Sequence, residues 1–156
     1  GLDHGAVSQI RHLKARMERE RIPRGIDARR HLKLGPGGMS DIEFAVQIIQ
    51  ARNAALIPSL RVSGTLDALA AASEAGLVAS ADAQTLADSY RFIARLRNRY
   101  FLLVGRPVEA LTTKPEELEA LGIALGFDEQ PRQELEDTFL RTTRRVRRIC
   151  EPLIFD

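Results

Sequence analysis

A chain of 156 residues is long enough to bury one hydrophobic core, and its single cysteine cannot form an internal disulfide. We therefore expect one domain covering residues 1–156 and a reducing, cytoplasmic location. The 23 basic and 21 acidic residues leave a net charge of only +2, and aromatic residues make up 5% of the chain. No apolar run approaches the ~20 residues of a membrane helix. This balance argues against a membrane protein and against a general nucleic-acid-binding surface.

The apolar spacing in the first half of the chain predicts three helices. The first covers residues 6–21, before Pro23 and Gly25 interrupt it, and its inward face comprises Val7, Ile10, Leu13 and Met17. The second runs from about residue 41 to residue 56, and its inward face comprises Ile42, Ala45, Val46, Ile49 and Asn53. The third begins at residues 63–65 and stops at Gly76.

Three more helices are predicted in the second half. The fourth is capped by Ser80 and ends at Gly105, with an inward stripe of Ala83, Leu86, Tyr90, Ile93, Arg97 and Tyr100. The fifth begins at residues 113–115 and ends at Gly126. The sixth opens at Asp128, with an inward stripe of Leu135, Phe139, Thr142, Val146, Ile149 and Leu153. Together the segments predict an all-α bundle of about six helices, running up and down around the four longest.

The segment LKLGPGGMSDIEF, residues 32–44, resembles several ligand motifs without matching them. A phosphate loop needs a lysine after its last glycine, whereas Lys33 stands before the glycines, and a dinucleotide fingerprint needs a third glycine where Ser40 stands. Asp41 and Glu43 are two residues apart, so on a helix their side chains diverge by roughly 200°. The segment therefore predicts neither a phosphate loop nor a metal site.

Two hypotheses remain for this segment. Ser40 and Glu43 have the spacing of a capping box, which would make the segment a helix start. A capping box leaves the lysine and the clustered glycines unexplained, because glycines are used where backbone approaches closely or φ is positive. The alternative is a surface that meets an anion or another domain. Its residues would be Lys33, Gly35, Gly37, Gly38, Asp41 and Glu43.

The run RTTRRVRR places four arginines along one side of the sixth helix, namely Arg141, Arg144, Arg145 and Arg148. They form either a solvated face or a docking surface for an acidic partner or a nucleotide. The three histidines lack the spacing of a metal cluster, and Cys150 lies beside the core stripe, where packing is its expected role. We predict no catalytic residue and no metal ligand in this chain.

The segment HLKLGPGGMSDIEFAVQIIQ resembles glutamine synthetase adenylyltransferases, bifunctional enzymes in which a helical domain follows each of two nucleotidyltransferase domains. The residues that match the family motif are Lys33, Gly37, Gly38, Asp41, Ile42, Glu43 and Phe44. The likeness continues through IPSLRVSGTLDAL, RLRNRYFLLVGRP and TTRRVRRICEPLIFD, so it covers nearly the whole chain. The related PII uridylyltransferases share the helical domain type and match this motif less well.

The resemblance implies that this is the C-terminal helical domain, in the adenylylating half, because Ser40 and Asp41 are similar to the second copy. The family transfers AMP from ATP, with Mg²⁺, to a tyrosine of glutamine synthetase. Its metal-binding carboxylates belong to the nucleotidyltransferase domain, which is absent from this sequence, so the chain alone is expected to be inactive. Implied partners are that domain, glutamine synthetase and, as a further candidate, the PII signalling protein. The alternative is a non-enzymatic, arginine-rich module that binds nucleic acid or an acidic protein.

Overall fold

The computed structural model describes residues 4–156, and within them the secondary structure is helical with no strands. Two short 3₁₀ turns, η1 (Ala28–Arg30) and η2 (Pro58–Leu60), lie in the connections. The six α-helices are α1 (His4–Glu20), α2 (Met39–Asn53), α3 (Thr65–Glu74), α4 (Ser80–Val104), α5 (Pro115–Ala124) and α6 (Pro131–Phe155). The predicted all-α bundle is therefore confirmed.

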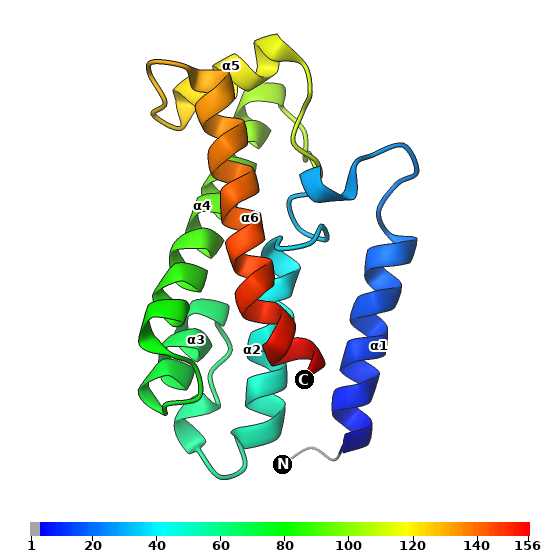
Figure 1. Ribbon diagram of the computed structural model, residues 1–156, viewed down its shortest axis with the longest axis vertical. Coiled ribbons are helices and arrows are strands. Elements are labelled where there is room, and N and C mark those ends of the chain that lie inside the picture. The colour runs from blue at the N-terminus through cyan, green and yellow to red at the C-terminus, as the bar shows by residue number, and fades with distance from the viewer. Residues whose placement is uncertain (1–3) are drawn as a thin grey trace.

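The four longest helices alternate in direction, as predicted (Figure 1). In Figure 1, α1 and α4 run upward and α2 and α6 run downward, so the start of α1 and the end of α6 both lie toward the lower end of the bundle. The last helix occupies the centre, where it packs against α2, α4 and α5. None of the helices in residues 4–156 is long and apolar enough to cross a membrane.

The core consists of two clusters stacked along the bundle. One joins α1, α2 and α3 to the lower parts of α4 and α6, and it includes Ile48, Leu86 and Val146. The other joins α5 to the upper parts of α4 and α6, and it includes Leu121 and Phe139. The start of α6 therefore packs in the cluster with α5 and its end in the cluster with α1, α2 and α3, so this one helix contributes to both parts of the core.

The inward faces differ from the predicted ones in four helices. In α2, Asn53 is only half-buried, whereas Phe44 and Ile48, which were not predicted, are buried. In α6 the buried positions after Phe139 are Thr143, Val146, Cys150 and Ile154, so Thr142, Ile149 and Leu153 were wrongly assigned as the most buried. In α4 the buried set comprises Ala83, Leu86, Ser89, Ile93, Leu96 and Tyr100, which excludes the predicted Tyr90 and Arg97. In α1 Leu13 is 53% exposed, whereas Lys14 faces inward. In these helices the buried face is offset from the predicted face by about one residue. The prediction followed the apolar side chains, whereas polar or small side chains occupy some of the buried positions.

Candidate functional site

The glycine-rich connection between α1 and α2 is anchored at both ends by backbone hydrogen bonds. His31 forms an isolated antiparallel bridge with Ala110, and the neighbouring Leu32 N–H donates to the Glu109 carbonyl at 2.8 Å. At the other end, the Met39 N–H donates to the Leu32 carbonyl at 3.2 Å. The connection is therefore a closed loop held against the segment that follows α4.

The predicted capping box is wrong. Helix α2 begins at Met39, and the N-cap residue is Gly38, which has no side chain to cap with. Ser40 lies inside the first turn, where its N–H donates to the Lys33 carbonyl at 2.9 Å. The acid that serves this helix start is Asp41, since its Oδ2 accepts from the Gly37 N–H at 2.7 Å. The first residue of α4, Ser80, likewise follows its N-cap Ala79 and does not cap that helix.

Close packing within the domain explains the three glycines of the loop. Gly37 has φ of +75°, and a Cβ there would lie 1.8 Å from the Thr143 carbonyl oxygen of α6. A Cβ on Gly35 would lie 2.2 Å from the Ala28 carbonyl oxygen, and one on Gly38 would lie 2.7 Å from the carbonyl oxygen of Lys33. Real Cβ atoms do not approach backbone oxygens this closely, so any side chain would displace the loop.

A buried ion cluster joins α1, α2 and α6 beneath the loop. Lys14 pairs with Asp41 at 2.5 Å, both side chains being 1% exposed, and Lys14 also pairs with Glu18. From α6, Arg147 lies 3.3 Å from Asp41 and 3.5 Å from Glu18. Burial alone would lower the pKa of Arg147, but the carboxylates of Asp41 and Glu18 outweigh it and raise that pKa. Because it contacts a cation from each neighbouring helix, Asp41 is the centre of the cluster.

Sequence reasoning missed the two cations of this cluster. Lys14 shares the inward face of α1 with Val7 and Met17, and its ammonium lies 5.7 Å from the centre of the Phe44 ring. The spacing of these positions could have identified Lys14, because it falls where an apolar residue belongs. Arg147 is harder to single out from the sequence, since the same run contains six other arginines or threonines.

The acids of this motif do not fit a magnesium site. Asp41 is fully buried, and its oxygens already contact Lys14, Arg147 and the Gly37 N–H. Glu43 comes from another side of α2, as the helical geometry predicts. Among residues 4–156, no three His, Cys, Asp or Glu side chains gather closely enough to hold a metal ion. Any magnesium chemistry must therefore use carboxylates outside this cluster.

The predicted motif divides into two groups in the structure. Its three glycines and Asp41 are used for contacts inside the domain. The other two residues, Lys33 and Glu43, are half-buried, and no side-chain hydrogen bond or ion pair within the described residues involves them. Pro36, at the tip of the loop, is exposed. Only Lys33, Glu43 and the loop tip are therefore available to a group outside this domain.

The four arginines predicted as a docking surface lie together on one exposed face of α6. We call Arg141, Arg144, Arg145 and Arg148 the arginine ridge; with Asp137 they line a shallow hollow of about 640 Å³. Helices α4 and α6 pack together, and no arginine of α4 lines this hollow. Arg97, for example, reaches the Met39 sulfur at 3.5 Å instead.

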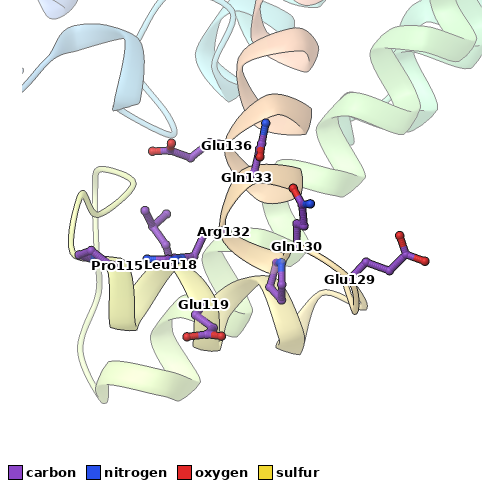
Figure 2. Close-up of a pocket in the computed structure, with 9 residues that line it drawn as sticks. Pro115, Leu118, Glu119, Glu129, Gln130, Arg132, Gln133 and Glu136 are labelled. Carbon is purple, nitrogen blue, oxygen red and sulfur yellow. The ribbon is translucent and has the colours of Figure 1, made fainter.

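A second hollow, of about 530 Å³, lies between α5 and the start of α6 and was not predicted (Figure 2). Three of its residues are acids, but Figure 2 shows the carboxylates of Glu119, Glu129 and Glu136 pointing in different directions. One of them, Glu136, pairs with Arg30 at 2.7 Å. Divergent carboxylates do not make a shared cation site, and we assign this hollow no chemistry.

Two further titratable side chains, His31 and Cys150, are buried parts of the fold. His31 is 2% exposed, its Nδ1 accepts from the Leu34 N–H at 3.0 Å, and burial lowers its pKa. Cys150 is fully buried in the α6 stripe, and burial raises the pKa of its thiol. A thiol that is inaccessible and protonated is a poor nucleophile. His4 and His12 are exposed on α1.

Comparison with known proteins identifies the family. The family model described as GlnD PII-uridylyltransferase matches residues 8–154. A bifunctional glutamine synthetase adenylyltransferase/adenylyl-removing enzyme of Streptomyces coelicolor is 44% identical over 99% of this chain, which covers 16% of that relative. An enzyme of the same name from Cutibacterium acnes is 42% identical over 100% of this chain, which covers 16% of that relative. Another from Mycolicibacterium smegmatis is 40% identical over 98% of this chain, which covers 15% of that relative.

The chain thus spans about one-sixth of the length of these curated relatives. Their similarity extends over both core clusters, the glycine-rich loop and the arginine ridge, since nearly every residue of the chain is aligned. The chain belongs to the family whose model is described as GlnD PII-uridylyltransferase, and the curated relatives that it matches over nearly its whole length are named glutamine synthetase adenylyltransferases.

Proposed function

We propose that this chain is the helical domain that supports AMP transfer from ATP to a tyrosine hydroxyl of glutamine synthetase. The observation that carries the proposal is 44% identity over 99% of the chain to an enzyme named for that adenylylation. We assign it to the adenylylating half, because Ser40 and Asp41 are similar to the motif in the second of the family's two helical domains. The proposal includes a cytoplasmic location, and the free, buried Cys150 is compatible with a reducing compartment.

The domain's role in this proposal is support and not metal catalysis. ATP and Mg²⁺ would be held by the nucleotidyltransferase domain, because Asp41 is already occupied by two cations and the Gly37 N–H. The buried cluster fixes α1, α2 and α6 relative to one another, which gives the loop a defined position. Lys33 could then present a cation to a phosphate or to a carboxylate of the neighbouring domain.

Glutamine synthetase and the adjacent nucleotidyltransferase domain are the partners in this proposal. The PII signalling protein is a further candidate, supported by the family description, which names enzymes that act on PII. Contact with Lys33 and Glu43 is proposed for the adjacent domain alone, because both lie beside the exposed loop tip.

AMP incorporation into glutamine synthetase tests the proposal directly. The isolated chain should transfer no AMP with ATP and Mg²⁺, the full-length protein should transfer it, and deletion of this segment from the full-length protein should abolish transfer. Robust turnover by the isolated chain would show that it carries its own catalytic site. Full activity after deletion of the segment would show that the domain does not support the reaction.

A further inference from the structure

The charges of the arginine ridge are not neutralised within the described part of the chain. All four side chains are exposed, and no carboxylate of residues 4–156 forms an ion pair with any of them. The one hydrogen bond from the ridge is a long one, from Arg144 Nε to the Leu140 carbonyl of the same helix at 3.3 Å. Arg147, which lies between ridge residues in sequence but faces the buried cluster, is by contrast paired with Asp41 and Glu18.

Such a ridge does not stabilise the helix that carries it. Arg141 and Arg145, and likewise Arg144 and Arg148, are four residues apart, so their like charges repel each other. The favourable helix dipole acts on cations only in the last turn, and Arg148 lies about two turns before the end of α6 at Phe155. An anion bound from outside would relieve this repulsion.

The ridge is too short for an extended polyanion. Seven residues separate its ends, which corresponds to about 10 Å along the helix axis. Beyond it, toward the start of α6, the chain carries Asp137 and Glu136, and Figure 2 shows Glu129 and Glu136 at that end of the helix. A nucleic-acid backbone that followed α6 would therefore leave the basic surface within one turn and meet acids. No exposed aromatic side chain lines the hollow for base stacking.

A small phosphate is also a poor match for this surface. The ridge lies in the middle of a helix, where backbone N–H groups are bonded within the helix and cannot bind phosphate oxygens. The adjoining cleft of about 470 Å³ contains two more arginines, Arg29 and Arg147. These already pair with Asp27 and Asp41, so the cleft adds no free cation.

We propose that the arginine ridge is a docking surface for an acidic segment of a protein partner. The segment would carry three or four carboxylates within about 10 Å, matching the four guanidinium groups, each of which can bind a carboxylate through two parallel hydrogen bonds. Acidic side chains on one face of a helix, spaced three or four residues apart, have this spacing. The inference is independent of AMP transfer, because it concerns binding to a surface that contains none of the residues assigned to that reaction.

Fluorescence anisotropy on the full-length protein tests this inference. The probe is a labelled helical peptide of about 15 residues with four glutamates spaced three or four apart, compared with its glutamine counterpart. At about 25 mM NaCl the glutamate peptide should bind and the glutamine peptide should not. Binding of the glutamate peptide should weaken at least ~10-fold at about 150 mM NaCl. Arg141→Glu/Arg145→Glu should weaken it at least ~10-fold, whereas the lysine pair Arg141→Lys/Arg145→Lys should lie between the two.

The matched control is Arg52→Glu/Arg95→Glu, which makes the same charge change at exposed arginines of α2 and α4. It should alter peptide binding less than ~2-fold. Thermal melts should show both glutamate pairs folded, because all four positions are exposed. The inference is overturned if the wild type does not bind the peptide at low salt or if the control weakens binding equally. It is also overturned if the ridge variant loses affinity for duplex DNA or ATP rather than for the peptide.

Discussion

Lys14 of α1 and Asp41 of α2 form an ion pair in which each side chain is only 1% exposed. The same carboxylate binds the Gly37 N–H and Arg147, so one acid connects the first helix, the glycine-rich loop and the last helix. Burying ions is unfavourable unless their charges are matched, and here the Asp41 carboxylate faces the cations of Lys14 and Arg147. A motif acid that could be taken for a metal ligand is therefore an internal anchor.

Asp41→Asn should lower the free energy of unfolding by about 3–5 kcal/mol, because it leaves Lys14 buried without its carboxylate. Lys14→Met should cost less, since Asp41 keeps Arg147 and the Gly37 N–H as partners. Urea denaturation measures both changes. The control is Lys114→Met on the surface, which should stay within ~0.5 kcal/mol of the wild type. Equal stability of Asp41→Asn and the wild type would exclude Asp41 as the anchor.

Gly37→Ala should destabilise the domain far more than Gly25→Ala, although both glycines have positive φ. At Gly25 nothing lies within 4 Å of a new Cβ, so only the backbone conformation costs energy, about 1–2 kcal/mol. At Gly37 the Cβ would also overlap the Thr143 carbonyl, which should raise the loss above ~3 kcal/mol. Equal losses for the two variants, measured by denaturant unfolding, would contradict the close approach of the loop to α6.

The buried His31 predicts a loss of stability at acid pH. Burial lowers its pKa from the ordinary value of 6.5, so below about pH 6.5 the unfolded chain binds a proton that the folded chain does not. The contribution of neutral His31 to the free energy of unfolding should therefore be lost as the pH falls from about 7 to 5. His31→Asn keeps an acceptor for the Leu34 N–H and should flatten the decline. His12→Gln, on the exposed side of α1, should leave it unchanged; an unaltered slope in His31→Asn would reject the assignment.

The fold could be predicted because its signals are local. Apolar spacing identified all six helices, and Gly105, with φ of +74° at the C-cap of α4, ends that helix where expected. The rotations of the inward faces were harder to predict: spacing marks position 14 of α1 as inward, but the partners that allow a lysine to be buried there are far away in sequence. The Lys14 ammonium is stabilised there by its ion pair with Asp41 and its contact with the Phe44 ring, and neither contact can be read from the α1 sequence.

The candidate site was predicted as a set of residues but not as an arrangement. The clustered glycines indicated close backbone approach, and the structure shows that Thr143 of α6 is what Gly37 approaches. Sequence spacing also suggested Ser40 as a cap, whereas Gly38 occupies that position and Asp41 binds the loop. The difference arises because the loop hydrogen bonds, which depend on the approach to α6 and to the segment after α4, determine where α2 begins.

The motif divides between residues that anchor the loop inside the domain and Lys33, which we propose serves AMP transfer. The most direct measurement is AMP incorporation into glutamine synthetase by the full-length Lys33→Ala enzyme, beside Lys114→Ala as the matched lysine control. We predict at least a ~10-fold lower rate for Lys33→Ala, about 1.4 kcal/mol of transition-state binding, with the control unchanged. Both variants should keep the wild-type melting temperature, because Lys114 is exposed, Lys33 is only half-buried, and neither lies in the buried ion cluster. An unchanged rate for Lys33→Ala, or a loss that a matching fall in melting temperature explains, would contradict the claim.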